Sequence, residues 1–269
     1  MSNNYPMIAS LMMASLGDIA AIEVIAHRGN SSENPENTMV GFNSAIEMHA
    51  DYIELDVHLN KEGIPIVIHD ITTQRTTNSS SNTPISKLSM NKLKALDAGV
   101  WFDAQFAGEQ IPTLEEVLTM PLHGTGVMIE VKRGSAPKEN LAAAVAQAIN
   151  NTYSSHLGHK IYIGSMSKEI LHEIRKLLPN QPIIAIIESA SDYRNHMLNS
   201  PDITAFSKAI LTKEMIDEVH SFNKKVWVWT VDSPDTMRQL IEHGVDGIIT
   251  NRPKILQSIL REYQITHHQ

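Results

Sequence analysis

Two acidic residues on one short apolar stretch are the residues with the clearest chemical meaning. Glu54 and Asp56 lie two positions apart in the stretch Ile53-Glu54-Leu55-Asp56-Val57, so on a β-strand their side chains would share one face. Two carboxylates so close together repel each other unless a cation lies between them or one is protonated. A hard divalent ion with oxygen ligands fits this arrangement best.

A second pair of residues repeats this spacing later in the chain, as Glu130-Val131-Lys132. Glu130 would add a third carboxylate to the site. Lys132 and Arg28 would bring two fixed cations close to one bound metal ion. Several positive centres of this kind suit a phosphate ester, because its transition state spreads negative charge over several oxygens.

Two histidines flank the acidic stretch, and each follows a short apolar run. His27 precedes Arg28, and His69 precedes Asp70, so we expect both histidines at the C-terminal ends of strands. Histidine titrates near neutral pH, as a general acid or base must. A single histidine here would more often be a core residue, and a single Glu-x-Asp a solvent-facing stripe. Their joint occurrence at successive strand ends favours catalysis.

Several other histidines lack charged neighbours next to an apolar run. We therefore expect them on the surface or in loops: His58, His123, His156, His172 and His220.

The elements that must position these residues alternate along the chain. Strands are expected at 22–26, 51–57, 64–68, 127–131, 160–164, 183–187, 204–206, 226–231 and 246–250. Helices are expected up to residue 48 and at 138–150, 168–178, 213–222 and 234–243. This alternation predicts a parallel sheet covered by helices. Chemistry at the strand ends favours a TIM-type barrel, whose active site lies at its C-terminal rim. A barrel has eight strands, so we expect at least one of the nine to be wrong.

Two segments do not follow this alternation. Only about seven residues separate the second and third strands, which is short for a crossover helix. Either the barrel lacks a helix there or the two strands form a hairpin. Residues 71–112 contain a loop rich in Thr, Ser and Asn and a short helix at 89–96. We interpret them as a small insertion on the active-site rim. A capping box of Thr113 and Glu116 follows the insertion.

Composition limits the class of protein. The chain has 269 residues, of which 42% are hydrophobic, and this suits one barrel-sized catalytic domain over residues 1–269. Its 22 Lys and Arg against 30 Asp and Glu give a formal net charge of −8, which argues against a nucleic-acid partner. There are no cysteines, so disulfides, thiolate catalysis and zinc on sulfur are excluded.

The N-terminal segment 1–21 is apolar from residue 7 onward. No Lys or Arg precedes Arg28, so the basic region of a signal peptide is missing. The apolar run is also too short to span a bilayer. We predict a helix packed on the bottom or flank of the barrel, with a signal remnant as the alternative. No stable membrane anchor is expected. The expected location is the cytoplasm, or outside the cell if the segment is a signal remnant.

Nine motifs occur in register between about residue 23 and residue 260. They are His27-Arg28-Gly29, Pro35-Glu36-Asn37-Thr38, Ile53-Glu54-Leu55-Asp56-Val57, Val67-Ile68-His69-Asp70, Arg75-Thr76-Thr77, Ile111-Pro112-Thr113-Leu114-Glu115-Glu116, Glu130-Val131-Lys132, Trp229-Thr230-Val231 and Gly244-Val245-Asp246-Gly247-Ile248. In these motifs the chain resembles the glycerophosphodiester phosphodiesterase family.

The resemblance implies a TIM-type (β/α)8 barrel with a small insertion at 71–112. It also implies hydrolysis of small glycerophosphodiesters to glycerol 3-phosphate and an alcohol, with a divalent ion, Ca²⁺ or Mg²⁺. The positions that match the family's metal ligands are Glu54, Asp56 and Glu130. The positions that match its acid and base are His27 and His69. The positions that match its substrate contacts are Arg28, Lys132 and Trp229.

Three positions depart from the usual pattern of the family. Met166 replaces an aromatic residue, Asp232 replaces Asn, and Asn251 replaces Asp. We expect none of them to touch the metal or the histidines, so they would affect substrate fit only.

Two other functions remain open. One is headgroup cleavage like that of a lysophospholipase D or sphingomyelinase D. The other is a catalytically silent phosphodiester-binding protein, which the presence of both histidines disfavours. The oligomeric state is left open.

Overall fold

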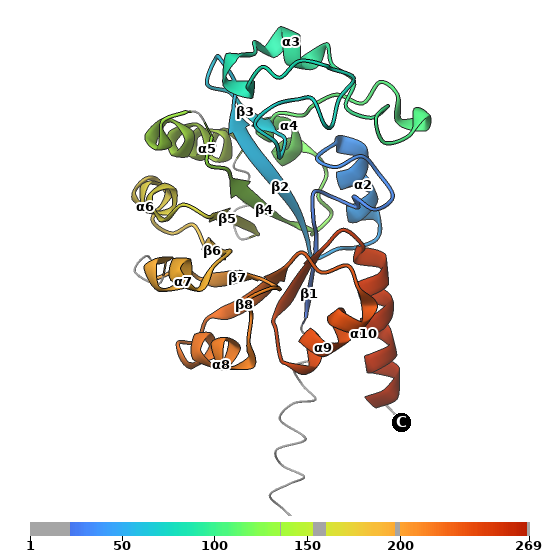
Figure 1. The fold of residues 1–269 in the computed structure, drawn as a ribbon, viewed down its shortest axis with the longest axis vertical. Helices are drawn as coiled ribbons and strands as arrows, with labels where there is room; N and C mark the ends of the chain where they lie inside the picture. Colours follow the sequence, from blue (N-terminus) through green and yellow to red (C-terminus); the bar gives the residue numbers. More distant parts are fainter. Residues whose placement is uncertain (1–21, 135, 153–159, 197–199, 268–269) are drawn as a thin grey trace, which may run out of the picture.

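Eight parallel strands close into a barrel within the part of the chain that the computed structural model describes, residues 22–134, 136–152, 160–196 and 200–267 (Figure 1). Their order is β1-β9-β8-β7-β6-β5-β4-β2, and β1 pairs with β2 to close the ring. The barrel strands are β1 (Glu23–Ala26), β2 (Tyr52–Leu59), β4 (Gly126–Val131), β5 (Ile161–Ser165), β6 (Ile183–Ile187), β7 (Ile203–Ser207), β8 (Lys225–Trp229) and β9 (Gly247–Thr250). The predicted TIM-type barrel is confirmed.

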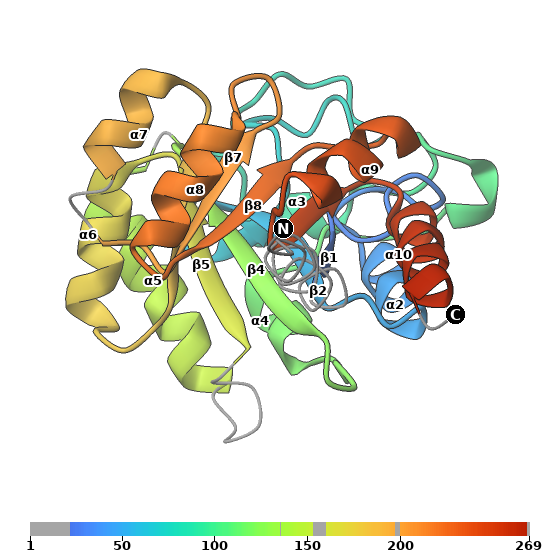
Figure 2. The ribbon, with the colours of Figure 1, turned by 90° about the horizontal axis from the view of Figure 1, so that it is seen from below.

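Helices cover the outside of this barrel (Figure 2). They are α2 (Met39–Glu47), α4 (Leu114–Thr119), α5 (Lys138–Thr152), α6 (Lys168–Leu177), α7 (Ala190–His196), α8 (Lys213–Ser221), α9 (Pro234–Glu242) and α10 (Pro253–His267). The predicted helices are confirmed with small shifts at their ends. Helices α7 and α10 were not predicted.

All nine predicted strands are present among the described residues, so the expectation that one was wrong is itself wrong. The additional strand is β3 (Pro65–Val67), which pairs antiparallel with β2. Val57 faces Val67 and Leu59 faces Pro65 in this register. The short connection that left two alternatives open is therefore a hairpin. Gly63 supplies the positive φ of 78° that its turn needs.

Strand β2 divides its side chains between two environments. Ile53, Leu55 and Val57 are fully buried in the layer between the sheet and the helices. The alternate residues face the inside of the barrel, where Tyr52 packs with Trp227 in a separate apolar cluster. This alternation follows from the period of two of a strand. It places the acidic residues of β2 inside the barrel, above an apolar floor.

Residues 71–112 lie beside one end of the barrel, over β3 (Figure 1). They hold two 3-10 turns, Ile85–Lys87 and Ala104–Phe106, and the short helix α3 (Met90–Lys94). Their apolar side chains form a cluster of their own with β3. It comprises Ile66, Ile68, Ile85, Leu93, Ala98 and Ile111.

The prediction for the N-terminal segment 1–21 lies outside the described residues. Among the helices that the structure does describe, none is long and apolar enough to cross a membrane.

The capping box predicted before α4 is confirmed. Thr113 Oγ1 accepts a hydrogen bond from the Glu116 N–H at 3.1 Å, and Glu116 Oε2 accepts one from the Thr113 N–H at 2.7 Å. Lys94 Nζ, on α3, lies 2.6 Å from the same Glu116 oxygen. The box therefore also ties the insertion to the barrel.

Replacing Thr113 with Ala should lower the free energy of unfolding by about 0.5–2 kcal/mol, because one orphan N–H of the helix loses its acceptor. The same substitution at Thr119 is a matched control, since its hydroxyl only donates to carbonyl groups of α4. Urea unfolding measures both variants. Equal losses at the two positions would show that the cap has no special role.

Candidate active site

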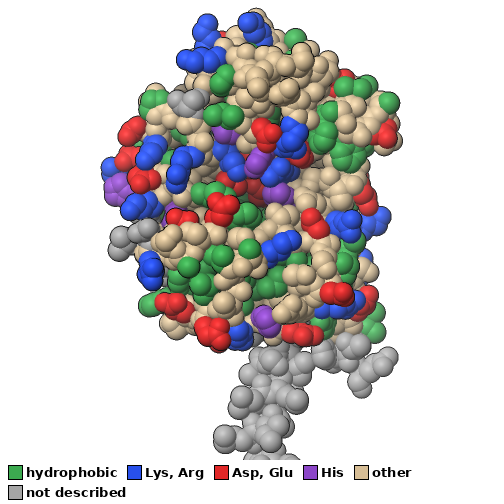
Figure 3. Space-filling view, viewed as in Figure 1, with side chains coloured by type: hydrophobic (Ala, Val, Ile, Leu, Met, Phe, Trp, Pro, Cys, Tyr) green, Lys and Arg blue, Asp and Glu red, His purple; other side chains and the backbone are tan. Residues whose placement is uncertain are grey.

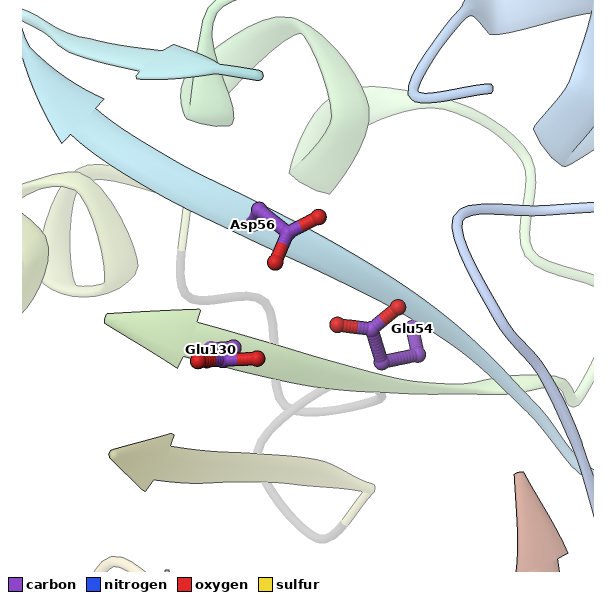
Figure 4. Close-up of side chains that lie close together, drawn as sticks. All are labelled: Glu54, Asp56 and Glu130. Atoms are coloured by element: carbon purple, nitrogen blue, oxygen red, sulfur yellow. The ribbon is translucent and has the colours of Figure 1, made fainter. Parts of the chain in front are cut away.

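Three carboxylates from β2 and β4 meet inside the barrel, as the sequence predicted (Figure 4). The parallel register of the two strands sets Asp56 directly beside Glu130, and Glu54 lies two residues earlier on β2. One oxygen from each carboxylate can be chosen so that all three lie within 4.8 Å of one another. Such spacing allows one small cation to touch all three side chains.

The carboxylates fit a divalent metal ion. Glu54 and Asp56 are buried, with 2% and 0% of their surface exposed. Asp56 Oδ1 accepts no hydrogen bond from any described residue, although Lys132 Nζ forms an ion pair with it at 3.4 Å. A buried carboxylate oxygen without a hydrogen-bond donor is costly. An all-oxygen ligand set suits a hard cation.

Two cations flank the carboxylates. Arg28 Nε lies 3.3 Å from Asp56 Oδ2, and Lys132 Nζ lies 2.9 Å from Glu130 Oε1. The backbone of Arg28 also takes part, because its N–H donates to Glu54 Oε2 at 2.9 Å. Arg28 has a φ of 57°, a conformation that few non-glycine residues adopt. The predicted cations therefore both reach the acidic cluster.

Charge is distributed unequally over the three carboxylates. Burial alone would raise the pKa of Asp56, but Lys132 and Arg28 bring it down to about 2. Burial and the negative charge of Asp56 raise the pKa of Glu54 well above its ordinary value. Burial also raises the pKa of Glu130, against the opposing effect of Lys132. Three carboxylates exceed two cations by one negative charge, which a proton on Glu54 neutralises when no metal ion is bound.

His27 lies just beyond β1, and its backbone N–H donates to the carbonyl of Thr250 at 2.9 Å. Its Nε2 is 4.0 Å from Glu54 Oε2, and its Nδ1 is 2.7 Å from Asn251 Oδ1. Burial, together with the charge of Arg28, lowers the pKa of His27 to about 4. Its imidazole is therefore neutral near pH 7 and can accept a proton.

His69 lies just beyond β3 and is joined to Arg28 through a chain of charged groups. Its Nδ1 is 2.8 Å from Asp70 Oδ1. Arg75 donates to both oxygens of Asp70, at 2.8 and 2.9 Å, and these bonds lower the pKa of Asp70. Arg75 also makes two 2.7 Å bonds to Glu36, which accepts from Arg28 at 2.8 Å. The insertion thereby connects the two sides of the site.

The space-filling view shows the setting of these groups. Histidine, basic and acidic side chains gather near the centre of the face seen in Figure 3. Trp229 ends β8, and its indole N–H donates to the carbonyl of Ala205 at 3.0 Å. Its ring is partly buried against the barrel interior. The indole nitrogen is therefore already hydrogen-bonded within the barrel.

Several residues of this network were not assigned a role from the sequence. Asn37 donates to Asp56 Oδ2 at 2.9 Å, and its Oδ1 accepts from the Asp56 N–H at 3.3 Å. Glu36, Asp70 and Arg75 orient the groups described above. All four belong to motifs of the family resemblance. In the sequence Glu36 and Asn37 were identified only as parts of a family motif, and no pattern there indicates that Arg75 reaches back to Glu36.

The prediction for His58 is wrong. It was expected on the surface or in a loop, yet it lies on β2 with 5% of its surface exposed. Its Nε2 is 2.9 Å from the carbonyl oxygen of His69. The physical reason is that His58 continues the inward alternation of Glu54 and Asp56. The expectation holds for three others, His123, His172 and His220, which are exposed. His156 lies outside the described residues.

The expectation that no departure touches a histidine is also wrong. Asn251 lies 2.7 Å from His27, and Asp232 accepts a hydrogen bond from Asn251. Asn251 and His27 are 224 residues apart in sequence, but closure of the barrel pairs β1 with β9. Met166 packs against the cluster inside the barrel, and its carbonyl lies 3.0 Å from His196 Nε2.

An acidic cluster with two cations and two histidines, at the C-terminal end of a (β/α)8 barrel, defines a class of enzyme that acts on phosphate esters. The model of the "Glycerophosphoryl diester phosphodiesterase family" matches residues 27–255. The chain belongs to this family. It is a phosphodiester hydrolase whose substrates are glycerophosphodiesters, as the sequence predicted.

Individual relatives agree with this assignment. A glycerophosphodiester phosphodiesterase of Caldanaerobacter subterraneus subsp. tengcongensis is 35% identical over 245 residues, which cover 89% of this chain and 98% of that protein. The phosphodiesterase of Oleispira antarctica, solved with the product sn-glycerol-3-phosphate, has a similar fold. Its TM-score is 0.82 at 24% identity, over 89% of this chain and 96% of that one. A glycerophosphodiester phosphodiesterase of Agrobacterium tumefaciens has a TM-score of 0.75 at 26% identity, over 88% and 99%.

Replacing Glu54 with Gln should stabilise the metal-free protein, and increasingly so as the pH rises. The native state holds the Glu54 proton more tightly than the unfolded chain does. Stability is therefore lost as the pH rises above the ordinary value of 4.5, by up to about 1.4 kcal/mol per pH unit. Gln has no proton to lose, so the difference in unfolding free energy between variant and wild type should grow with pH.

Chemical unfolding in the presence of a chelator measures this difference at several pH values. Replacing the exposed Glu47 of α2 with Gln is the matched control, and its difference should stay flat. If metal-free Glu54→Gln is less stable than the wild type throughout, the three carboxylates do not repel one another.

Proposed function

We propose that this chain hydrolyses glycerophosphodiesters with one divalent ion held by Glu54, Asp56 and Glu130. The observation that supports the proposal is the buried acidic cluster, which lies between the two cations Arg28 and Lys132. One oxygen of Asp56 in this cluster accepts no hydrogen bond from any described residue. Oxygen ligands favour Ca²⁺ or Mg²⁺. When bound, such an ion polarises a phosphoryl oxygen and neutralises the negative charge that develops on it.

Arg28 and Lys132 would bind the phosphate. The guanidinium of Arg28 is a planar fork that can donate to two phosphate oxygens, whereas the ammonium of Lys132 acts as a point charge. Burial would lower the pKa of Lys132, but Glu130 and Asp56 raise it, so the side chain stays charged. Both cations then stabilise the charge of the transition state.

We assign His27 as the general base. It is neutral near pH 7 because burial and Arg28 lower its pKa to about 4. Its Nδ1 contacts Asn251, so Nε2 is the nitrogen that faces the carboxylates. Nε2 would take a proton from the nucleophile, which is either water or a neighbouring hydroxyl of the glycerol.

We assign His69 as the general acid. Its Nδ1 contacts Asp70, a carboxylate that Arg75 keeps ionised. Because Asp70 holds Nδ1, Nε2 is the nitrogen from which His69 would donate a proton to the leaving alcohol. The products would be glycerol 3-phosphate and the free alcohol, in agreement with the product found in the Oleispira antarctica structure.

Removal of the metal tests the proposal. Excess EDTA should abolish turnover of glycerophosphocholine, and Ca²⁺ or Mg²⁺ should restore it, because three carboxylates outnumber Arg28 and Lys132 and would repel a phosphate once the ion is removed. EDTA already saturated with the ion is the control and should have no effect. Undiminished turnover in excess chelator would rule out the metal.

Release of headgroups from lysophospholipid micelles without turnover of soluble diesters would support the alternative substrate class.

The two histidines can be told apart by the leaving group. His27→Ala and His69→Ala should each lower kcat for glycerophosphocholine by about 10²–10⁴-fold. A glycerophosphodiester of p-nitrophenol needs no acid, because p-nitrophenolate leaves without a proton. It should therefore restore much of the activity of His69→Ala but not that of His27→Ala.

The exposed His172→Ala is the control and should behave as wild type with both substrates. Rescue of His27→Ala instead of His69→Ala would reverse the assignment.

A further inference from the structure

Asn251 and Asp232 form a hydrogen-bonded pair next to the nitrogen of His27 that does not face Glu54. Neither residue has been given a catalytic role above. Asn251 directly follows β9, and Asp232 lies soon after β8. Asn251 Oδ1 is 2.7 Å from His27 Nδ1, and Asn251 Nδ2 donates to Asp232 Oδ2 at 2.7 Å. The three side chains come together because β9 pairs with both β1 and β8 in the closed sheet.

Asp232 decides which way the Asn251 amide points. Its Oδ1 accepts from the Asn251 N–H at 2.9 Å and from the Thr250 hydroxyl at 3.0 Å. A carboxylate offers acceptors only, so the amide must turn its NH₂ group toward Asp232 and its oxygen toward His27.

The orientation of the amide in turn decides where His27 carries its proton. An amide oxygen accepts hydrogen bonds and cannot donate them. The contact between Asn251 Oδ1 and His27 Nδ1 is therefore a hydrogen bond only if Nδ1 bears the hydrogen. In the neutral imidazole the other nitrogen, Nε2, then has a free lone pair. That nitrogen is the one 4.0 Å from Glu54.

We propose that Asn251 and Asp232 are positioning residues that hold neutral His27 in the tautomer with its hydrogen on Nδ1. This inference deepens the proposed function and rests on the assignment of His27 as the base. A hydrogen on Nε2 would block the transfer of a proton from the nucleophile. If the pair were only structural, its loss would affect stability but not the tautomer.

Exchanging the two residues provides a sharp test, because the pair is complementary in either order. Asn251→Asp alone places two carboxylates side by side, because Asn251 and Asp232 are now joined by a hydrogen bond of 2.7 Å. The two negative charges would repel each other. Asp232→Asn alone leaves two amides. The Asn251 amide can then turn over and offer its NH₂ to His27 Nδ1, which shifts the hydrogen to Nε2.

The double exchange restores every hydrogen bond. The carboxylate introduced at position 251 would accept from His27, and the amide introduced at position 232 would donate its NH₂ group to that carboxylate. The oxygen of this amide would still accept from the Thr250 hydroxyl and the backbone N–H of residue 251, as Asp232 Oδ1 does now. Each single variant should therefore be worse than the double variant.

The tautomer is measured first, by ¹⁵N NMR of histidine-labelled full-length protein above neutral pH, without metal or substrate. The His27 signals are identified from their absence in His27→Ala. We expect the hydrogen on Nδ1 in the wild type and in the double variant that combines Asp232→Asn with Asn251→Asp, and a shift toward Nε2 in Asp232→Asn alone. A wild-type His27 with its hydrogen on Nε2 would overturn the proposal.

Kinetics of glycerophosphocholine hydrolysis provide the second measurement. Each single variant should lose about 10–100-fold in kcat, the usual effect of removing the partner that orients a histidine, with KM close to that of the wild type. The double variant should recover most of this loss. Two exposed substitutions, Asn140→Asp and Asp235→Asn, are the controls and should change neither parameter.

A double variant no more active than the worse single variant would contradict the positioning role. If a single variant does not fold, which its melting curve would show, the wild-type and double-variant tautomers still decide the matter. Failure of the proposed function would look different, because a wild type without diesterase activity would leave the NMR result intact.

Discussion

Repulsion among three carboxylates inside a barrel is the constraint on which the rest of this site depends. The register of β2 and β4 sets Asp56 beside Glu130, and the period of β2 adds Glu54 on the same inner face. Like charges in a buried site cannot all ionise without cations close by. The role of each surrounding residue therefore follows from how it compensates the negative charge of the three carboxylates.

The balancing groups come from different parts of the chain, and several serve two purposes. Arg28 pairs with Asp56 through its side chain and binds Glu54 through its backbone N–H. Arg75 lies in the segment between β3 and α4, yet it joins Glu36 to Asp70 and so supports both Arg28 and His69. A phosphate would thus enter a site whose cations are already fixed, which reduces the reorganisation needed in the transition state. Retaining unpaired negative charge costs stability at the place where the chemistry occurs.

Much of this could be predicted from sequence because it depends on local periodicity. Alternation along β2 is enough to set Glu54 and Asp56 on one face, and the βα repeat is enough to bring strand ends to one rim. The antiparallel β3 was left open, because a short connection fits either a hairpin or a barrel strand without its helix. His58 was misplaced because the same alternation was not followed beyond Val57.

Contacts that need barrel closure could not be predicted in this way. Asn251 meets His27 only because the last strand pairs with the first, and no local pattern contains that information. The link from Arg75 to Glu36 likewise joins residues 39 positions apart, with α2, β2 and β3 between them. These long-range contacts orient the histidines. The sequence therefore predicted the residues that meet in the site better than the residues that orient them.

The most direct test of this account is a crystal structure with a bound divalent ion, located by its anomalous scattering. One peak is predicted in contact with an oxygen of each of Glu54, Asp56 and Glu130, at about 2.0–2.6 Å depending on the ion. Arg28 and Lys132 should remain beside it, free to meet a phosphate. A well-occupied ion elsewhere in the barrel, with these three carboxylates still in contact only with protein, would contradict the account.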